Sequence, residues 1–116
     1  MLKLGTLVVA MVVFSLSSVF AQPTRINVTH TAVNVTTSST EVIAAKTMRG
    51  FLLIVNDSDT TLYCKVGASA VVNEGIRINA NGGSFEMGRG GRNIDTRVVN
   101  CIHGGTGNKV ALMTEG

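Results

Sequence analysis

Beyond residue 21, hydrophobic and polar residues alternate in short runs, and clusters of Gly, Asn, Asp, Ser and Thr separate the runs. Alternation with a period of two is typical of a β-strand with one buried face, and no run has the period of an amphipathic helix. The runs are also rich in Val, Ile and Thr, which fit a pleated and half-buried surface. The pattern therefore predicts an all-β fold.

About eight short strands are predicted, at a spacing of roughly 8 to 12 residues that is typical of a small β-sandwich or a jelly-roll-like barrel. In the first of them the hydrophobic positions change phase near Thr31 and Ala32, which predicts a β-bulge or two strands that meet there. The expected strands are 25–37, 41–45, 51–55, 61–66, 75–79, 84–87, 97–103 and 109–114.

Two further features predict how these strands are arranged. Residues 51–55 are apolar at every position, which predicts a central strand covered on both faces. The polar turn at 56–59 joins this strand to 61–66, and we expect the two to form a hairpin. The last two strands, 97–103 and 109–114, are expected to form a second pair across a glycine-rich turn.

The first 21 residues follow a different pattern. The positive start Met1-Leu2-Lys3 precedes an apolar run, 4–20, and Ala21 is the small residue that a signal peptidase prefers. We therefore predict a signal peptide over residues 1–21 and a single β-sandwich domain over residues 22–116. The alternative is an uncleaved membrane anchor, because the apolar run is close to the roughly 18 residues that span a bilayer.

The charge of the predicted mature segment, 22–116, is small. It has nine Lys and Arg against seven Asp and Glu, a net charge of +2, and the two signs are interspersed along the chain. A nucleic-acid-binding protein concentrates its basic residues on one surface, so we expect no nucleic-acid partner.

The chain has two cysteines, Cys64 and Cys101, each inside a predicted strand. In an exported protein an even pair indicates a disulfide, whereas in a reducing compartment the two would be small apolar core residues. Closing a loop of this length would contribute roughly 3 to 4 kcal/mol to stability. We predict a disulfide between them.

The glycine-rich stretch 78–93, INANGGSFEMGRGGRN, is the first candidate for ligand chemistry. A phosphate-binding glycine loop requires a helix after it, and arginine-glycine segments that bind RNA occur in multiple copies. Neither condition holds, so we predict turns between strands. Arg89 and Arg92 are the residues of this stretch that we would expect to contact an anionic group or a protein partner.

Three other motifs resemble parts of functional sites but are incomplete. His103-Gly104-Gly105 resembles an oxyanion-hole segment, yet the chain lacks a G-x-S-x-G nucleophile motif. Asp57-Ser58-Asp59 lacks the further ligands of a Ca²⁺ loop, and neither His30 nor His103 has a Cys or carboxylate at ligand spacing. We therefore predict no catalytic, metal-binding or cofactor-binding residues, and a protein that is not an enzyme.

An ordered set of motifs in the second half of the chain is more specific. Its members are Arg49-Gly50 before an apolar run that ends in Asn56, Tyr63 before Gly67, Gly75-Ile76-Arg77-Ile78, Gly82-Gly83-Ser84-Phe85-Glu86 and the terminal segment 111–116. Over Arg49 to Gly116 this order resembles small β-sandwich virion structural and accessory proteins of tailed phages and prophages. The resemblance implies an interaction module without an active site. The signal-like start and the two cysteines depart from that group and indicate an exported relative.

These observations predict a non-enzymatic structural or interaction protein, such as a virion accessory, decoration or attachment module, found in the virion or exported. We expect protein partners or self-association in a larger assembly, and membrane contact only through residues 1–21 if they are retained. The Thr-rich segment 24–40 is the expected pairing arm, because few charges block the addition of a strand. The alternative is a periplasmic or cell-surface carbohydrate-binding, adhesion or fimbrial-type module, which the lack of Trp and the single Tyr disfavour.

Overall fold

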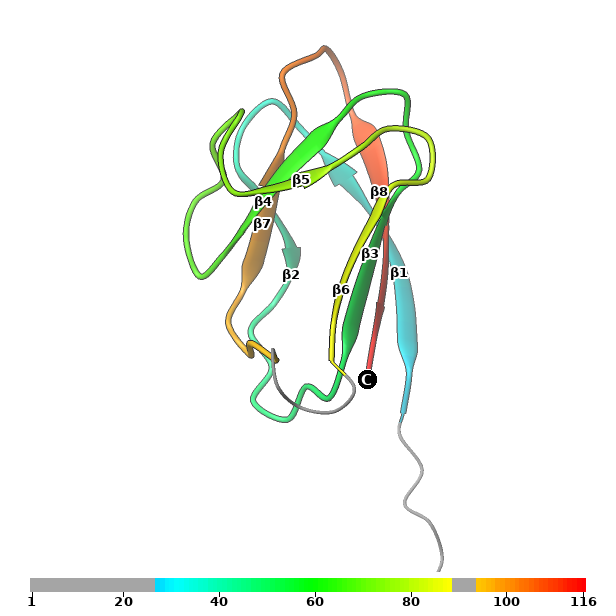
Figure 1. The fold of residues 1–116 in the computed structure, drawn as a ribbon, viewed down its shortest axis with the longest axis vertical. Helices are drawn as coiled ribbons and strands as arrows, with labels where there is room; N and C mark the ends of the chain where they lie inside the picture. Colours follow the sequence, from blue (N-terminus) through cyan, green and yellow to red (C-terminus); the bar gives the residue numbers. More distant parts are fainter. Residues whose placement is uncertain (1–26, 89–93) are drawn as a thin grey trace, which may run out of the picture.

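The computed structural model of this chain describes residues 27–88 and 94–116, and within these ranges the regular structure is entirely β (Figure 1). The predicted leader, 1–21, lies outside the described residues. The strands are β1 (Thr29–Val35), β2 (Thr40–Ile43), β3 (Leu52–Asn56), β4 (Leu62–Val66), β5 (Ile76–Ile78), β6 (Ser84–Met87), β7 (Val99–Ile102) and β8 (Lys109–Glu115). The all-β prediction is confirmed.

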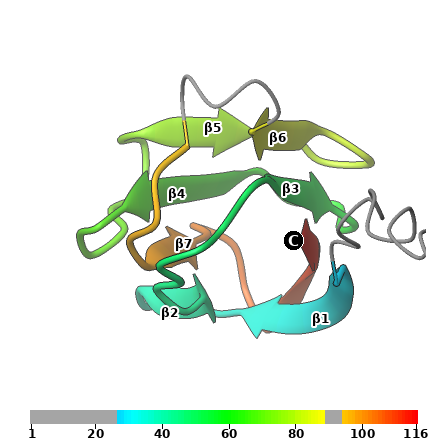
Figure 2. The same ribbon diagram turned by 90° about the horizontal axis from the view of Figure 1, so that it is seen from below.

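The strands form two four-stranded antiparallel sheets. Sheet A has the order β1-β8-β3-β6, and sheet B has the order β2-β7-β4-β5. The pairs β1–β8, β2–β7, β3–β6 and β4–β5 are nested inside one another, as if one long hairpin had been rolled up. Eight strands in this nested order make a jelly roll. Figure 2 shows the roll from below, with β1 beside β2 and β5 beside β6 where the edges of the sheets meet.

The hydrophobic core lies between the two sheets. It is built from the side chains that each strand points toward the opposite sheet, at every second position. Leu52 and Ile54 of β3 and Leu62 of β4 are fully buried there. The buried members of the core are Val35, Val42, Ile43, Leu52, Ile54, Leu62, Cys64, Ile78, Met87, Val99, Cys101, Ala111 and Met113.

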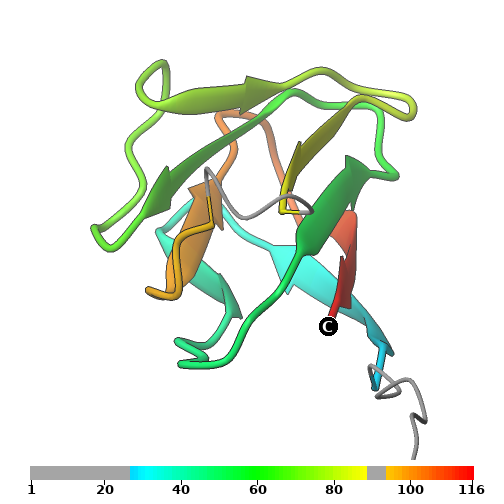
Figure 3. The same cartoon turned by 60° about the horizontal axis from the view of Figure 1, so that its bottom comes forward.

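Both predicted hairpins are wrong. β3 lies in sheet A and β4 in sheet B, so the turn between them carries the chain from one sheet to the other, and the β7–β8 connection does the same (Figure 3). β4 and β5 are the described neighbours in sequence that also pair in space. Turn residues show that the chain reverses, but they do not determine whether the next strand pairs with the previous one or packs across the core from it.

The predicted irregularity in the first strand is also wrong, because β1 pairs with β8 in one unbroken register from Thr29 to Val35. The hydrophobic pattern changes phase because the inward positions at the start of β1 are occupied by Thr29 and Thr31, which are polar. A register shift does occur in β2, between Glu41 and Ile43. The sequence pattern had not indicated it.

β3 is a central strand, as predicted, since it pairs with both β6 and β8. Its two faces are not equally covered, however. Leu52 and Ile54 are buried, whereas Leu53 and Val55 on the outer face are only half-buried. The expectation of full cover on both faces is therefore wrong.

The predicted disulfide is present between Cys64 of β4 and Cys101 of β7. The two residues lie directly opposite each other in sheet B, with a Cα–Cα distance of 4.1 Å, and both side chains are fully buried in the core. A buried disulfide is consistent with an oxidising, exported location. Among residues 27–88 and 94–116 no helix has the length and hydropathy needed to cross a bilayer.

Candidate interaction surface

Arg49 is the most buried Lys, Arg, Asp or Glu residue that the structure describes, and its side chain bonds to other parts of the fold. The guanidinium Nε donates to Glu115 Oε2 at 3.0 Å, in an ion pair whose arginine side chain is fully buried. Nη1 donates to the carbonyl oxygens of Asp95 and Arg97, and Nη2 donates to that of Ala44. The residue joins the chain after β2, the chain before β7 and the end of β8, so it closes one end of the sandwich.

The two other buried polar side chains fix the crossovers between the sheets. Asn56 Nδ2 donates to the carbonyl oxygens of Thr60 and Ile78, and its Oδ1 accepts from Ser58 Oγ. His103 Nδ1 accepts from the N–H of Gly105, so its Nε2 carries the proton and donates to the Gly107 carbonyl at 2.7 Å. His103 finds its partners in its own loop, whereas Asn56 also reaches the Ile78 carbonyl at the end of β5. Neither side chain has a buried polar atom without a hydrogen-bond partner.

Several motifs were singled out in the sequence. Where the structure describes their residues, these residues form turns and ion pairs of the fold. Residues 79–83 form the predicted turn, in which the N–H of Gly82 donates to the Asn56 carbonyl. Asp59 accepts from Lys109 Nζ at 2.9 Å. Arg89 and Arg92 lie outside the described residues. In the described part of the chain no three His, Cys, Asp or Glu side chains gather where one metal ion could bind them.

The outer face of sheet A has an aliphatic centre, which the polar residues His30, Asn34, Ser84, Glu86 and Thr114 surround. The register of the sheet places Ala32, Leu112 and Val55 in one row across β1, β8 and β3. Leu53 and Val110 lie diagonally beside this row, and Leu112 is 39% exposed. Adjacent apolar side chains on an outer face are a feature of surfaces that contact other proteins.

The outer face of sheet B has the opposite character. Its strands point Glu41, Lys65 and Arg77 outward, beside Asn100 and the half-buried Tyr63. Lys65 is paired with Glu74 at 2.8 Å. The two faces of the sandwich therefore differ in polarity, and sheet A is the face with fewer charged groups.

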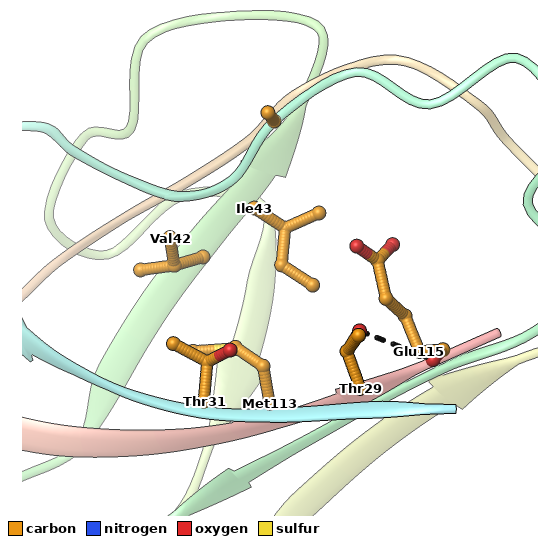
Figure 4. Close-up of a pocket in the computed structure, with 7 residues that line it drawn as sticks. Thr29, Thr31, Val42, Ile43, Met113 and Glu115 are labelled. Atoms are coloured by element: carbon orange, nitrogen blue, oxygen red, sulfur yellow. Dashed lines mark hydrogen bonds between the residues drawn. The ribbon is translucent and has the colours of Figure 1, made fainter. Parts of the chain in front are cut away.

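Sheet A also ends in an open edge. β1 pairs with β8 on one side, and no described strand pairs with it on the other. Beside this edge a pocket of about 170 Å³ lies between β1, β8 and β2 (Figure 4). Thr29 and Thr31 point into the gap and face Val42 and Ile43 across it. The remaining lining residues are Ala44, Met113 and Glu115.

Comparison of this chain with protein-family models, with curated protein sequences and with solved structures found no match. The interpretation of the surface therefore depends on the residues themselves. The sequence had indicated the Thr-rich strand of the open edge, within 24–40. It had not indicated the aliphatic centre of the outer face, because residues 110–113 are apolar at inward and outward positions alike and the two faces cannot be told apart.

Proposed function

We propose that this protein is an exported, non-enzymatic structural or interaction module, of the kind that tailed phages and prophages use as virion accessory, decoration or attachment proteins. One contrast carries this proposal: the buried polar side chains hold the fold together, whereas sheet A has a face and an edge that other molecules can contact. Arg49, Asn56 and His103 are all occupied in holding the fold. Sheet A, in contrast, offers an outer face with an aliphatic centre and an open edge.

Two further observations support the virion-type assignment. The order of motifs from Arg49 to Gly116 resembles that of small phage β-sandwich proteins, and the strand order is the jelly roll that many viral capsid domains share. The second point is an analogy at the level of the fold, because jelly rolls also occur in lectins and cupins. The buried Cys64–Cys101 disulfide supports export.

The proposal is tested by finding where the natural protein occurs. Particles from the culture supernatant of cells that express the chain are separated from free protein on a density gradient, and both fractions are analysed by mass spectrometry. We expect the chain in the particle fraction, with an N-terminus at Gln22. Leu112→Glu, which places a charge in the aliphatic row, should move the chain to the free fraction. Leu112→Met is the matched control. Recovery of wild-type chain only as free protein would contradict the proposal.

A further inference from the structure

The hydrogen-bonding groups of β1 that face the open edge can be identified from the sheet. In β8, the carbonyl of Val110 accepts from the Asp57 N–H, and Gly116 exchanges bonds with Phe51. The even-numbered residues of β8 therefore bond toward β3, and the odd-numbered ones bond toward β1, because successive residues of a strand point their groups to opposite sides. The register then leaves His30, Ala32 and Asn34 with N–H and C=O directed to the open edge.

β1 lacks the shortness, bulge, proline and charge that protect sheet edges, and in this it differs from the other three edges, although β2 lies beside it. Natural edges are protected by shortness, bulges, proline or charge. β2 has a bulge and Glu41, β5 has three residues and Arg77, and β6 has four residues and Glu86. β1 has seven residues in an unbroken register, and its sequence, THTAVNV, contains no Asp, Glu, Lys, Arg or Pro. This edge is therefore open to another strand.

We propose that the open edge of β1 pairs with β1 of a second copy of this chain, antiparallel, about a two-fold axis at Ala32. This deepens the proposed function, since it names one partner of the interaction module. Ala32 is the middle residue of β1, so the axis brings all three outward-directed residues into hydrogen-bonded pairs. Ala32 pairs with Ala32 of the second copy, and His30 pairs with Asn34 in both directions. These pairs exchange about six N–H···O=C bonds.

The side chains on both faces of this pairing are compatible with it. On the outer face Ala32 lies beside its own copy, so the aliphatic row continues through the axis into Leu112 and Val55 of the second copy. On the inner face Thr31 lies opposite Val33 of the second copy, which places a valine beside the pocket that Thr31 lines. No like charges meet across the axis, because β1 carries none.

A strand of seven residues buries less surface than the roughly 1,200–2,000 Å² of a standard stable interface. We therefore expect a concentration-dependent equilibrium between monomer and dimer rather than a permanent dimer. In a larger assembly, where copies are held close together, the same pairing would be strengthened by the high local concentration.

The first test uses Ala32→Pro in the disulfide-bonded mature protein, residues 22–116. The N–H of Ala32 faces the open edge, so proline there leaves the β1–β8 ladder intact but removes the central donor. Sedimentation velocity over a range of concentrations should show dimers for wild type and for the control Ala32→Thr. The dimer dissociation constant of Ala32→Pro should rise by about tenfold or more. A monomeric wild type, or an unchanged dimer in Ala32→Pro, would overturn the inference.

The second test examines the register and covers the case in which Ala32→Pro does not fold. Like charges directly opposite each other destabilise a strand pair, and opposite charges stabilise it. The double variant His30→Glu with Asn34→Glu should therefore weaken the dimer, whereas His30→Glu with Asn34→Lys should retain it. Equal dimerisation of both variants would refute the two-fold register. A wild-type chain that is monomeric but found in particles would refute this pairing and leave the proposed function standing.

Discussion

Arg49 stabilises the fold through four contacts to separate parts of the chain. Its guanidinium meets the Glu115 carboxylate and three backbone carbonyls, and its side chain is fully buried. A planar group with five donors in fixed directions can satisfy these acceptors together, and a lysine ammonium cannot. The residue therefore contributes to stability through geometry as well as charge.

Arg49→Ala is expected to lower the free energy of unfolding by about 3–5 kcal/mol, because it leaves a partly buried carboxylate and three carbonyls without their donor. Urea denaturation of the disulfide-bonded protein measures the loss. Arg49→Lys should lose part of this amount, and Glu115→Gln, which keeps an acceptor for Nε, should lose less than Arg49→Ala. A loss below about 1 kcal/mol in Arg49→Ala would show that this end of the sandwich is held by other contacts.

The sequence did not predict the roles of individual buried polar residues. Asn56 was predicted only as the start of a polar turn. Its side chain bonds within that turn, to Ser58, and also reaches the Ile78 carbonyl at the end of β5. In the sequence, His103 was considered only as part of an incomplete oxyanion-hole or metal-site motif, whereas its side chain is fully buried and holds the β7–β8 loop through hydrogen bonds. Such long-range partners depend on which strands pair or pack together, and a local sequence pattern carries no information about that.

The sequence predicted the positions of the strands along the chain well, but it predicted poorly which strands pair with each other. Alternation placed β6 correctly and placed the others to within a few residues, because an inward-facing side chain every second residue is a local requirement of a half-buried strand. The same alternation appears whether consecutive strands lie side by side or face each other across the core. The β3–β4 and β7–β8 connections were therefore taken for hairpins, and the aliphatic centre of the outer face of sheet A could not be foreseen.

The disulfide acts at this scale, since it ties β4 to β7 and closes a loop with a sequence separation of 37 residues. Replacement of both cysteines, Cys64→Ala with Cys101→Ala, is expected to cost roughly 3 to 4 kcal/mol through the greater entropy of the unfolded chain. Urea denaturation measures this cost. Reductant should destabilise the wild type by a similar amount and leave the double variant unchanged. A double variant as stable as the oxidised wild type would contradict the expectation.

The whole molecule should lose stability in acid through specific carboxylates. Asp95 accepts hydrogen bonds from the side chain and the backbone N–H of Arg97, and these bonds lower the pKa of its carboxyl from the ordinary 3.8 to about 2. A hydrogen bond from Lys109 lowers the pKa of Asp59 in the same direction. A carboxyl whose pKa is lower in the folded state adds stability above its unfolded pKa. It loses that contribution as the pH falls from about 4 toward 2.

Thermal unfolding of wild type and Asp95→Asn at a series of pH values tests this window. At neutral pH the variant should have the lower Tm, because it lacks the charged partner of Arg97. As the pH falls through 3.8 toward 2, the wild-type carboxyl becomes protonated, so the difference in Tm should shrink toward zero. Both side chains of this pair are partly exposed, so the difference should also shrink with added salt. A difference in Tm that stayed constant from neutral pH down to about 2 would show that Asp95 acts through its shape and hydrogen bonds and not through its charge.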